Sequence, residues 1–146
     1  QGVVQLKSNN PTESPIIDQR FFSEEEDLDT LLWGFKECRR IANSSVFQKY
    51  EPSEIHPGNK INSDDQLRDY IRGSGTTIFH PVGTCKMGTD KNSVVDSRLC
   101  VHGINGLRIA DASIMPRIIG GNTNAPSIMI GEKAAAMIKE DAAKLS

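Results

Sequence analysis

The stretch His80-Pro81-Val82-Gly83-Thr84-Cys85-Lys86-Met87-Gly88 decides how this chain is interpreted. Pro81 has no backbone N–H and restricts the residue before it to extended geometry, so it fixes the direction of the imidazole of His80. The preceding Thr76-Thr77-Ile78-Phe79 is β-branched and aromatic, and predicts a short strand that ends at His80. A histidine at such a position is either structural or available for acid–base work near neutral pH, where an unperturbed imidazole titrates at about pH 6.5.

Two further runs follow the first. Gly121-Asn122-Thr123-Asn124-Ala125-Pro126 opens an apolar segment with helical spacing. It predicts a terminal helix from about Ala125 to Glu140, with Asn124 in the capping position and Pro126 in the position of a first helical residue. Between the two runs lies Gly106-Leu107-Arg108-Ile109-Ala110-Asp111-Ala112-Ser113-Ile114-Met115-Pro116.

These three runs, in this order, resemble the C-terminal signature of the glucose-methanol-choline (GMC) oxidoreductases, flavoenzymes that oxidise alcohols. The resemblance is dense from about Thr76 to Asp141 and looser before that. No Gly-x-Gly-x-x-Gly run follows a strand in this sequence. The N-terminal half of the polypeptide, which in this family would hold the ADP part of FAD, is therefore not in this sequence. The resemblance therefore implies a partner, the N-terminal FAD-binding half, as a second chain or as a missing part of the same polypeptide. We expect this chain to be inactive alone.

The resemblance implies an α+β fold, in which part of an antiparallel-sheet substrate domain joins the last strand and helix of the FAD-binding domain. We expect residues 1–79 to belong to the substrate-binding domain. Residues 80–146 are expected to carry the active-site segment and to complete the FAD-binding domain.

Local patterns predict the remaining elements. Residues 3–7 predict a strand at the edge of an antiparallel sheet. Ser23 and the glutamates after it suggest a capping box for a helix from about Glu24 to Asn43, which should bury a stripe that includes Cys38. Ser63 caps a second helix through Ile71, after a loop over residues 51–62. Short strands at residues 94–95, 99–101 and 107–109 predict a meander.

The resemblance places chemistry on two side chains. His80 corresponds to the family's base, which removes the hydroxyl proton of the alcohol or orients the alkoxide. Asn124 falls where the family has a second histidine or asparagine, and its amide can donate a hydrogen bond to the substrate oxygen. The alternative for Asn124 is that it only caps the terminal helix.

The cofactor contacts follow from the same resemblance. The helix start has free N–H groups and a positive dipole end, which suit the electron-rich pyrimidine edge of a reduced flavin. Asn122, Thr123 and Asn124 are expected there, largely through backbone atoms. Asp111 and Ala112 are expected near the ribityl and pyrophosphate groups, although an aspartate after a strand is often only a turn residue.

Composition excludes several classes of partner. A net charge of −2 over 146 residues, with both signs interspersed, provides no basic face for nucleic acid. The apolar runs are shorter than the roughly 20 residues that cross a bilayer, so no transmembrane segment is expected. The spacing of the three cysteines, Cys38, Cys85 and Cys100, is not that of a metal site. We expect them to be reduced thiols that hold no metal.

The resulting hypothesis is an FAD-dependent oxidation of a small alcohol to an aldehyde or ketone, with His80 as base and hydride transfer to the flavin. Two alternatives remain open. Some members of the resembled family are cyanohydrin lyases or light-driven decarboxylases, and a fragment of this size could also be a non-catalytic binding module.

Overall fold

The computed structural model describes residues 1–145, and they divide into two compact units, with the boundary between Thr76 and Thr77. Each unit combines helix with short extended segments, and the α+β class is confirmed. The predicted boundary after residue 79 lies close to this division. The functional assignment of the two parts stays a prediction.

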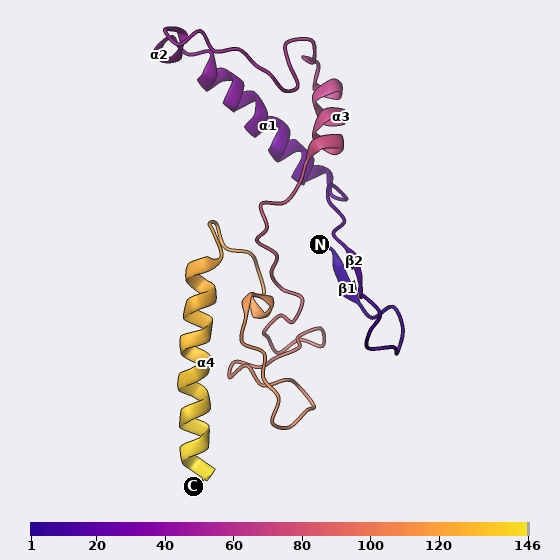
Figure 1. Ribbon diagram of the computed structural model, residues 1–146, viewed down its shortest axis with the longest axis vertical. Coiled ribbons are helices and arrows are strands. Elements are labelled where there is room, and N and C mark those ends of the chain that lie inside the picture. Colours follow the sequence, from indigo (N-terminus) through magenta and orange to yellow (C-terminus); the bar gives the residue numbers. More distant parts are fainter. Residues whose placement is uncertain (146) are drawn as a thin grey trace. The chain divides into compact units, whose positions relative to one another are not determined.

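The first unit begins with a small antiparallel hairpin (Figure 1). Strand β1, Val3–Gln5, pairs with β2, Ile16–Asp18, in the register Val3 to Asp18 and Gln5 to Ile16. The strand predicted at residues 3–7 is therefore present but shorter, because Asn10 and Pro11 lie in a turn between the two strands.

Three helices follow in this unit. They are α1, Glu25–Ala42, α2, Ser45–Gln48, and α3, Asp64–Ser74. Helix α3 begins as predicted, since Ser63 accepts from the backbone N–H of Gln66 at 3.2 Å and the Gln66 side chain accepts from the N–H of Ser63. The capping box suggested for Ser23 is wrong, because Glu24 occupies the capping position of α1 and makes no side-chain cap.

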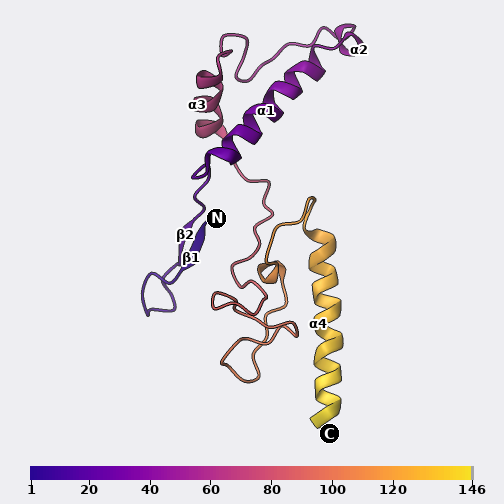
Figure 2. The same cartoon turned by 180° about the vertical axis from the view of Figure 1, so that it is seen from behind.

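Helices α1 and α3 pack side by side in both views (Figures 1 and 2). Leu28 and Leu67 are fully buried between them, and each such side chain contributes about 1.5–3 kcal/mol through burial. The expected apolar stripe of α1 is only partly buried. Leu31 and Ile41 are about half exposed and Cys38 is exposed.

The second unit contains little regular structure before its long helix. A single 3₁₀ turn, η1, covers Ala112–Ile114, and α4 covers Asn124–Leu145. The strands predicted at residues 94–95, 99–101 and 107–109 reduce to isolated bridges, such as Val95 to Val101 and Cys100 to Arg108. Leu99 has φ 65°, which is outside the extended region, so residues 99–101 do not form a regular strand.

One face of α4 covers the hydrophobic cluster of this unit. Ile130 and Ala134 are buried there against Val95, Leu99 and Ile114. The terminal helix is thus confirmed, and it extends to Leu145 rather than to about residue 140. Within residues 1–145 no helix has the length and apolarity needed to cross a membrane.

Candidate functional site

His80 lies in an irregular segment of the second unit, half-buried. The strand predicted over residues 76–79 is wrong. Phe79 has φ 64°, which is left-handed rather than extended, and its N–H donates to Oγ1 of Thr77 at 3.0 Å. A bulky residue rarely adopts this conformation, so the backbone is strained immediately before the histidine.

The imidazole of His80 contacts the third sequence run. Its Nδ1 lies 2.8 Å from Oγ1 of Thr123, a hydrogen bond between residues 43 positions apart. Thr123 is 8% exposed and is a buried polar residue. Because Asn124 is its chain neighbour, the bond brings both predicted catalytic positions to one place in the unit.

The middle run, residues 106–116, is held against the first run by backbone hydrogen bonds. The N–H of Cys85 donates to the carbonyl of Ser113 at 3.0 Å, and that of Met87 donates to the carbonyl of Ile114 at 2.8 Å. Gly83 has φ 86°, and a Cβ there would stand 3.2 Å from the carbonyl oxygen of Met115. This approach favours glycine. All three runs of the sequence therefore converge within the second unit.

The start of α4 differs from the prediction by one position. Asn124 is the first helical residue, so Thr123 occupies the capping position that the sequence assigned to Asn124. The carbonyl of Thr123 accepts from the hydroxyl of Ser127 at 2.6 Å and from its N–H at 3.0 Å. Asn122 and Asn124 are exposed on either side of the buried threonine.

The two predicted cofactor residues of the middle run have local structural roles. Asp111 is exposed and caps η1, because its Oδ1 accepts from the N–H of Ser113 at 2.7 Å. Ala112 packs partly against the hydrophobic cluster. A bound cofactor at either residue stays a prediction.

A charged cluster fixes the far half of α4. Asp141 accepts from Arg98 at 2.8 Å and also from Arg108. Burial acts to raise the pKa of Asp141, but the hydrogen bonds from Arg98 and Arg108 outweigh it and hold the pKa below its usual range. The helix that begins beside His80 is thus anchored by ion pairs near its end.

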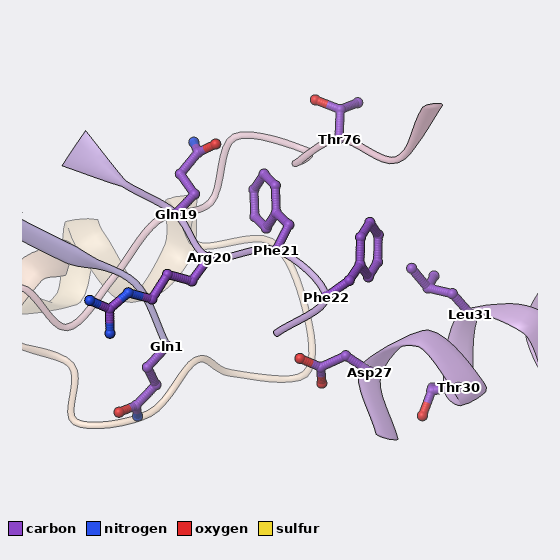
Figure 3. A pocket seen from close by; sticks show the side chains of 9 residues that line it. All are labelled: Gln1, Gln19, Arg20, Phe21, Phe22, Asp27, Thr30, Leu31 and Thr76. Carbon is purple, nitrogen blue, oxygen red and sulfur yellow. The ribbon is translucent and has the colours of Figure 1, made fainter. Parts of the chain in front are cut away.

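A separate hollow of about 430 Å³ lies in the first unit (Figure 3). The rings of Phe21 and Phe22 stand side by side there, with centroids 6.4 Å apart. None of the predicted site residues lines it. Its lining residues are Gln1, Gln19, Arg20, Phe21, Phe22, Asp27, Thr30, Leu31 and Thr76.

A family model for the C-terminal domain, described as GMC oxidoreductase, matches residues 1–131. The chain belongs to the GMC oxidoreductase family. Among curated relatives, an alcohol dehydrogenase [acceptor] of Pseudomonas putida is 47% identical over 99% of this chain and 27% of its own length. An oxygen-dependent choline dehydrogenase of Escherichia coli O139:H28 is 45% identical over 95% of this chain and 25% of its own length. This GMC chain thus spans about a quarter of the curated relatives that it matches.

Solved structures are similar to the GMC chain throughout its length. A formate oxidase of Aspergillus oryzae has a TM-score of 0.90 at 31% identity, over 99% of this chain and 26% of that chain. An FAD-dependent oxidoreductase from Chaetomium thermophilum has a TM-score of 0.89 at 30% identity, over 96% of this chain and 24% of that chain. A fungal aryl-alcohol oxidase has a TM-score of 0.84 at 32% identity, over 96% of this chain and 23% of that chain.

Sequence reasoning missed the bond from the Thr123 side chain to His80, because it expected Thr123 to act largely through backbone atoms. One local signal was present. The oxygen of a capping threonine accepts from the backbone N–H two or three residues on, and the third residue here is Pro126, which has no N–H. No group of three or more His, Cys, Asp or Glu side chains suited to a metal occurs within residues 1–145.

Proposed function

We propose that this chain is the C-terminal part of an FAD-dependent oxidoreductase that oxidises an alcohol to an aldehyde or ketone. The observation that carries the proposal is the 2.8 Å bond between His80 Nδ1 and Thr123 Oγ1, which joins a histidine to the start of a long helix. Membership of the GMC family supports it. So do the names of its relatives, an alcohol dehydrogenase, a choline dehydrogenase and an aryl-alcohol oxidase.

The residues at the start of α4 fit the electron-rich edge of a flavin. The first N–H groups of a helix have no partner within it, and the helix dipole places partial positive charge there. Asn122 and Asn124 are exposed at this end, where their backbone and amide groups can reach a ligand. Bound FAD would accept the hydride that leaves the carbinol carbon. The proposed contacts of Asp111 and Ala112 lie further along the cofactor.

His80 supplies the base in this proposal. Removing the hydroxyl proton pushes electron density onto the carbinol carbon and favours departure of the hydride. Asn124 donates an amide hydrogen bond to the substrate oxygen, which becomes more negative as the proton leaves. A neutral amide suits this role, because it stabilises the charge without competing for the proton.

The remainder of the enzyme is the proposed partner. This chain spans 27% of the alcohol dehydrogenase and 25% of the choline dehydrogenase that it resembles, which supports an N-terminal FAD-binding half elsewhere. Residues 1–79 then serve as part of the substrate-binding domain. Residues 80–146 complete the FAD-binding domain and carry His80 to the substrate.

The test is His80→Ala in the full-length flavoenzyme. We expect the rate of anaerobic flavin reduction by a primary alcohol to fall by about 10²-fold to 10⁴-fold, the usual worth of a positioned acid or base. The bound FAD content should stay near that of the unaltered protein. Stopped-flow absorbance of the flavin measures the rate, and the spectrum of the same sample measures the content.

Two controls keep the result interpretable. His102→Ala changes an exposed histidine of the same unit, whose Nε2 contacts the carbonyl of Gly88 at 3.0 Å, and should leave the rate within about twofold. An unaltered rate in His80→Ala would remove His80 from the mechanism. Release of cyanide from a cyanohydrin, or light-dependent loss of carbon dioxide, without flavin reduction by alcohol would reject oxidation.

A further inference from the structure

The side chain of Thr123 is buried between two exposed asparagines and is directed at His80. It is 8% exposed, whereas Asn122 and Asn124 are open to solvent. A buried hydroxyl needs a hydrogen-bond partner, and here the partner is Nδ1 of His80 at 2.8 Å. The contact belongs to the interior of the second unit and needs no other part of the protein.

The local sequence removes one of the two usual partners of this hydroxyl. Thr123 precedes the first residue of α4, where a threonine ordinarily accepts from the backbone N–H of the second or third helical residue. The third is Pro126, which has no N–H. The carbonyl of Thr123 is already held by both the hydroxyl and the N–H of Ser127. The backbone is therefore fixed, and the side chain projects to the histidine.

The bond matters because a neutral imidazole carries one proton on one of two nitrogens. Only the nitrogen without the proton can act as a base. A hydroxyl beside Nδ1 can accept from Nδ1–H, which leaves the lone pair on Nε2, or it can donate to Nδ1, which leaves the proton on Nε2. These two arrangements have opposite consequences for proton abstraction.

We propose that Thr123 is a positioning residue that accepts from Nδ1–H of His80 and so keeps Nε2 unprotonated and directed at the substrate. This inference rests on the proposed function, in which His80 is the base. The strained backbone at Phe79 and the following Pro81 constrain the main chain on both sides of the histidine, but they leave rotation of the ring about its Cβ–Cγ bond. The bond from Thr123 restricts that rotation.

The kinetic test compares two variants in the full-length flavoenzyme. Thr123→Val keeps the shape and removes the hydroxyl, and Thr123→Ser restores a hydroxyl. We expect the valine variant to reduce its flavin about 10-fold to 100-fold more slowly, the range seen when a partner that orients a metal-bound histidine is lost. The KM for alcohol should change little. The serine variant should recover most of the rate, and Thr89→Val, at an exposed threonine of the same unit, should match the unaltered enzyme.

The proton position is measured directly by ¹⁵N NMR on enzyme with labelled histidine, with the His80 signals assigned by their loss in His80→Ala. We expect a protonated Nδ1 and an unprotonated Nε2 in the unaltered enzyme. A protonated Nε2 would overturn the inference, and so would a full rate in Thr123→Val. If the valine variant does not fold, the NMR result on the unaltered enzyme still decides. A slow His80→Ala with a normal Thr123→Val refutes only Thr123, whereas a normal His80→Ala refutes the proposed function itself.

Discussion

Asn124 is the residue whose structural and chemical interpretations separate most clearly. The structure places it one position inside α4, so it is not the cap that the sequence suggested. An exposed side chain in the first turn has no evident packing role there. Its proposed role in binding the substrate oxygen can therefore be tested with little risk to the fold.

The prediction for Asn124→Asp is a loss of activity without a loss of stability. A carboxylate in the first turn suits the helix dipole, so the melting temperature should be unchanged or slightly raised. Beside a developing alkoxide the same charge is repulsive, and the hydride-transfer rate should fall at least tenfold, equivalent to about 1.4 kcal/mol of barrier. Melting and anaerobic flavin reduction are measured on one preparation. Retained turnover would remove Asn124 from the mechanism.

At the scale of elements, local signals predicted the three longer helices and the first strand, and failed for the strands expected in the second unit. The capping box of Ser63 and Gln66 lies within four residues, so the sequence contains it completely. A strand depends on a partner elsewhere, and the segments around Val95 and Cys100 find only single bridges. Phe79 shows the same limit, since nothing in its sequence indicates a positive φ.

The candidate site was also predictable only where short, local runs of sequence specify it. The resemblance of short runs identified His80 and the start of the terminal helix as parts of one site. The bond to Thr123 joins residues 43 positions apart, and only the missing N–H of Pro126 hinted that the threonine side chain was available. Long-range pairing of this kind becomes visible only when the chain is folded.

The turn at Asp90 gives a prediction about pH. Its carboxylate accepts from Ser93, from the N–H of Asn92 and from Lys86, and these bonds lower its pKa from 3.8 to about 2, with Ser93 the largest cause. A carboxyl whose pKa is lowered on folding stabilises the fold above its ordinary pKa, and this contribution disappears as the pH falls through the folded value.

We therefore expect Asp90→Asn to lower the denaturation midpoint of the full-length protein near pH 6. The difference from the unaltered protein should shrink as the pH falls from about 4 towards 2. Denaturant titrations monitored by circular dichroism at several pH values would measure it. A difference that stays constant across this range would contradict the assigned role of the carboxylate.

At the scale of the whole molecule, much apolar surface is left open. In the second unit Ile118, Ile128 and Met129 are each more than half exposed, near the residues proposed to contact the flavin. Large exposed apolar surface is typical of a face that another part of a protein covers. In the proposed function, that part is the N-terminal FAD-binding half.

The corresponding prediction is that the isolated 146-residue chain does not retain FAD and tends to associate. Asp111 and residues 122–124 can contact only part of so long a cofactor. Co-expression with the N-terminal half should yield a yellow, soluble complex with one FAD per complex. Absorbance spectra and size-exclusion chromatography measure both properties. A well-dispersed monomer that holds stoichiometric FAD alone would be the contrary result.

Helix α4 also sets the spacing between the contact to His80 at its start and the ion pairs near its end. Thr123 and Asp141 are 141 − 123 = 18 positions apart, which is five turns of 3.6 residues, so both lie on the face that carries Ile130 and Ala134. One inserted residue between them would rotate one end by about 100° relative to the other. Either the hydroxyl would turn away from His80 or the carboxylate would turn away from Arg98 and Arg108. The number of residues between Thr123 and Asp141 therefore matters for both contacts, in addition to the identity of the two side chains.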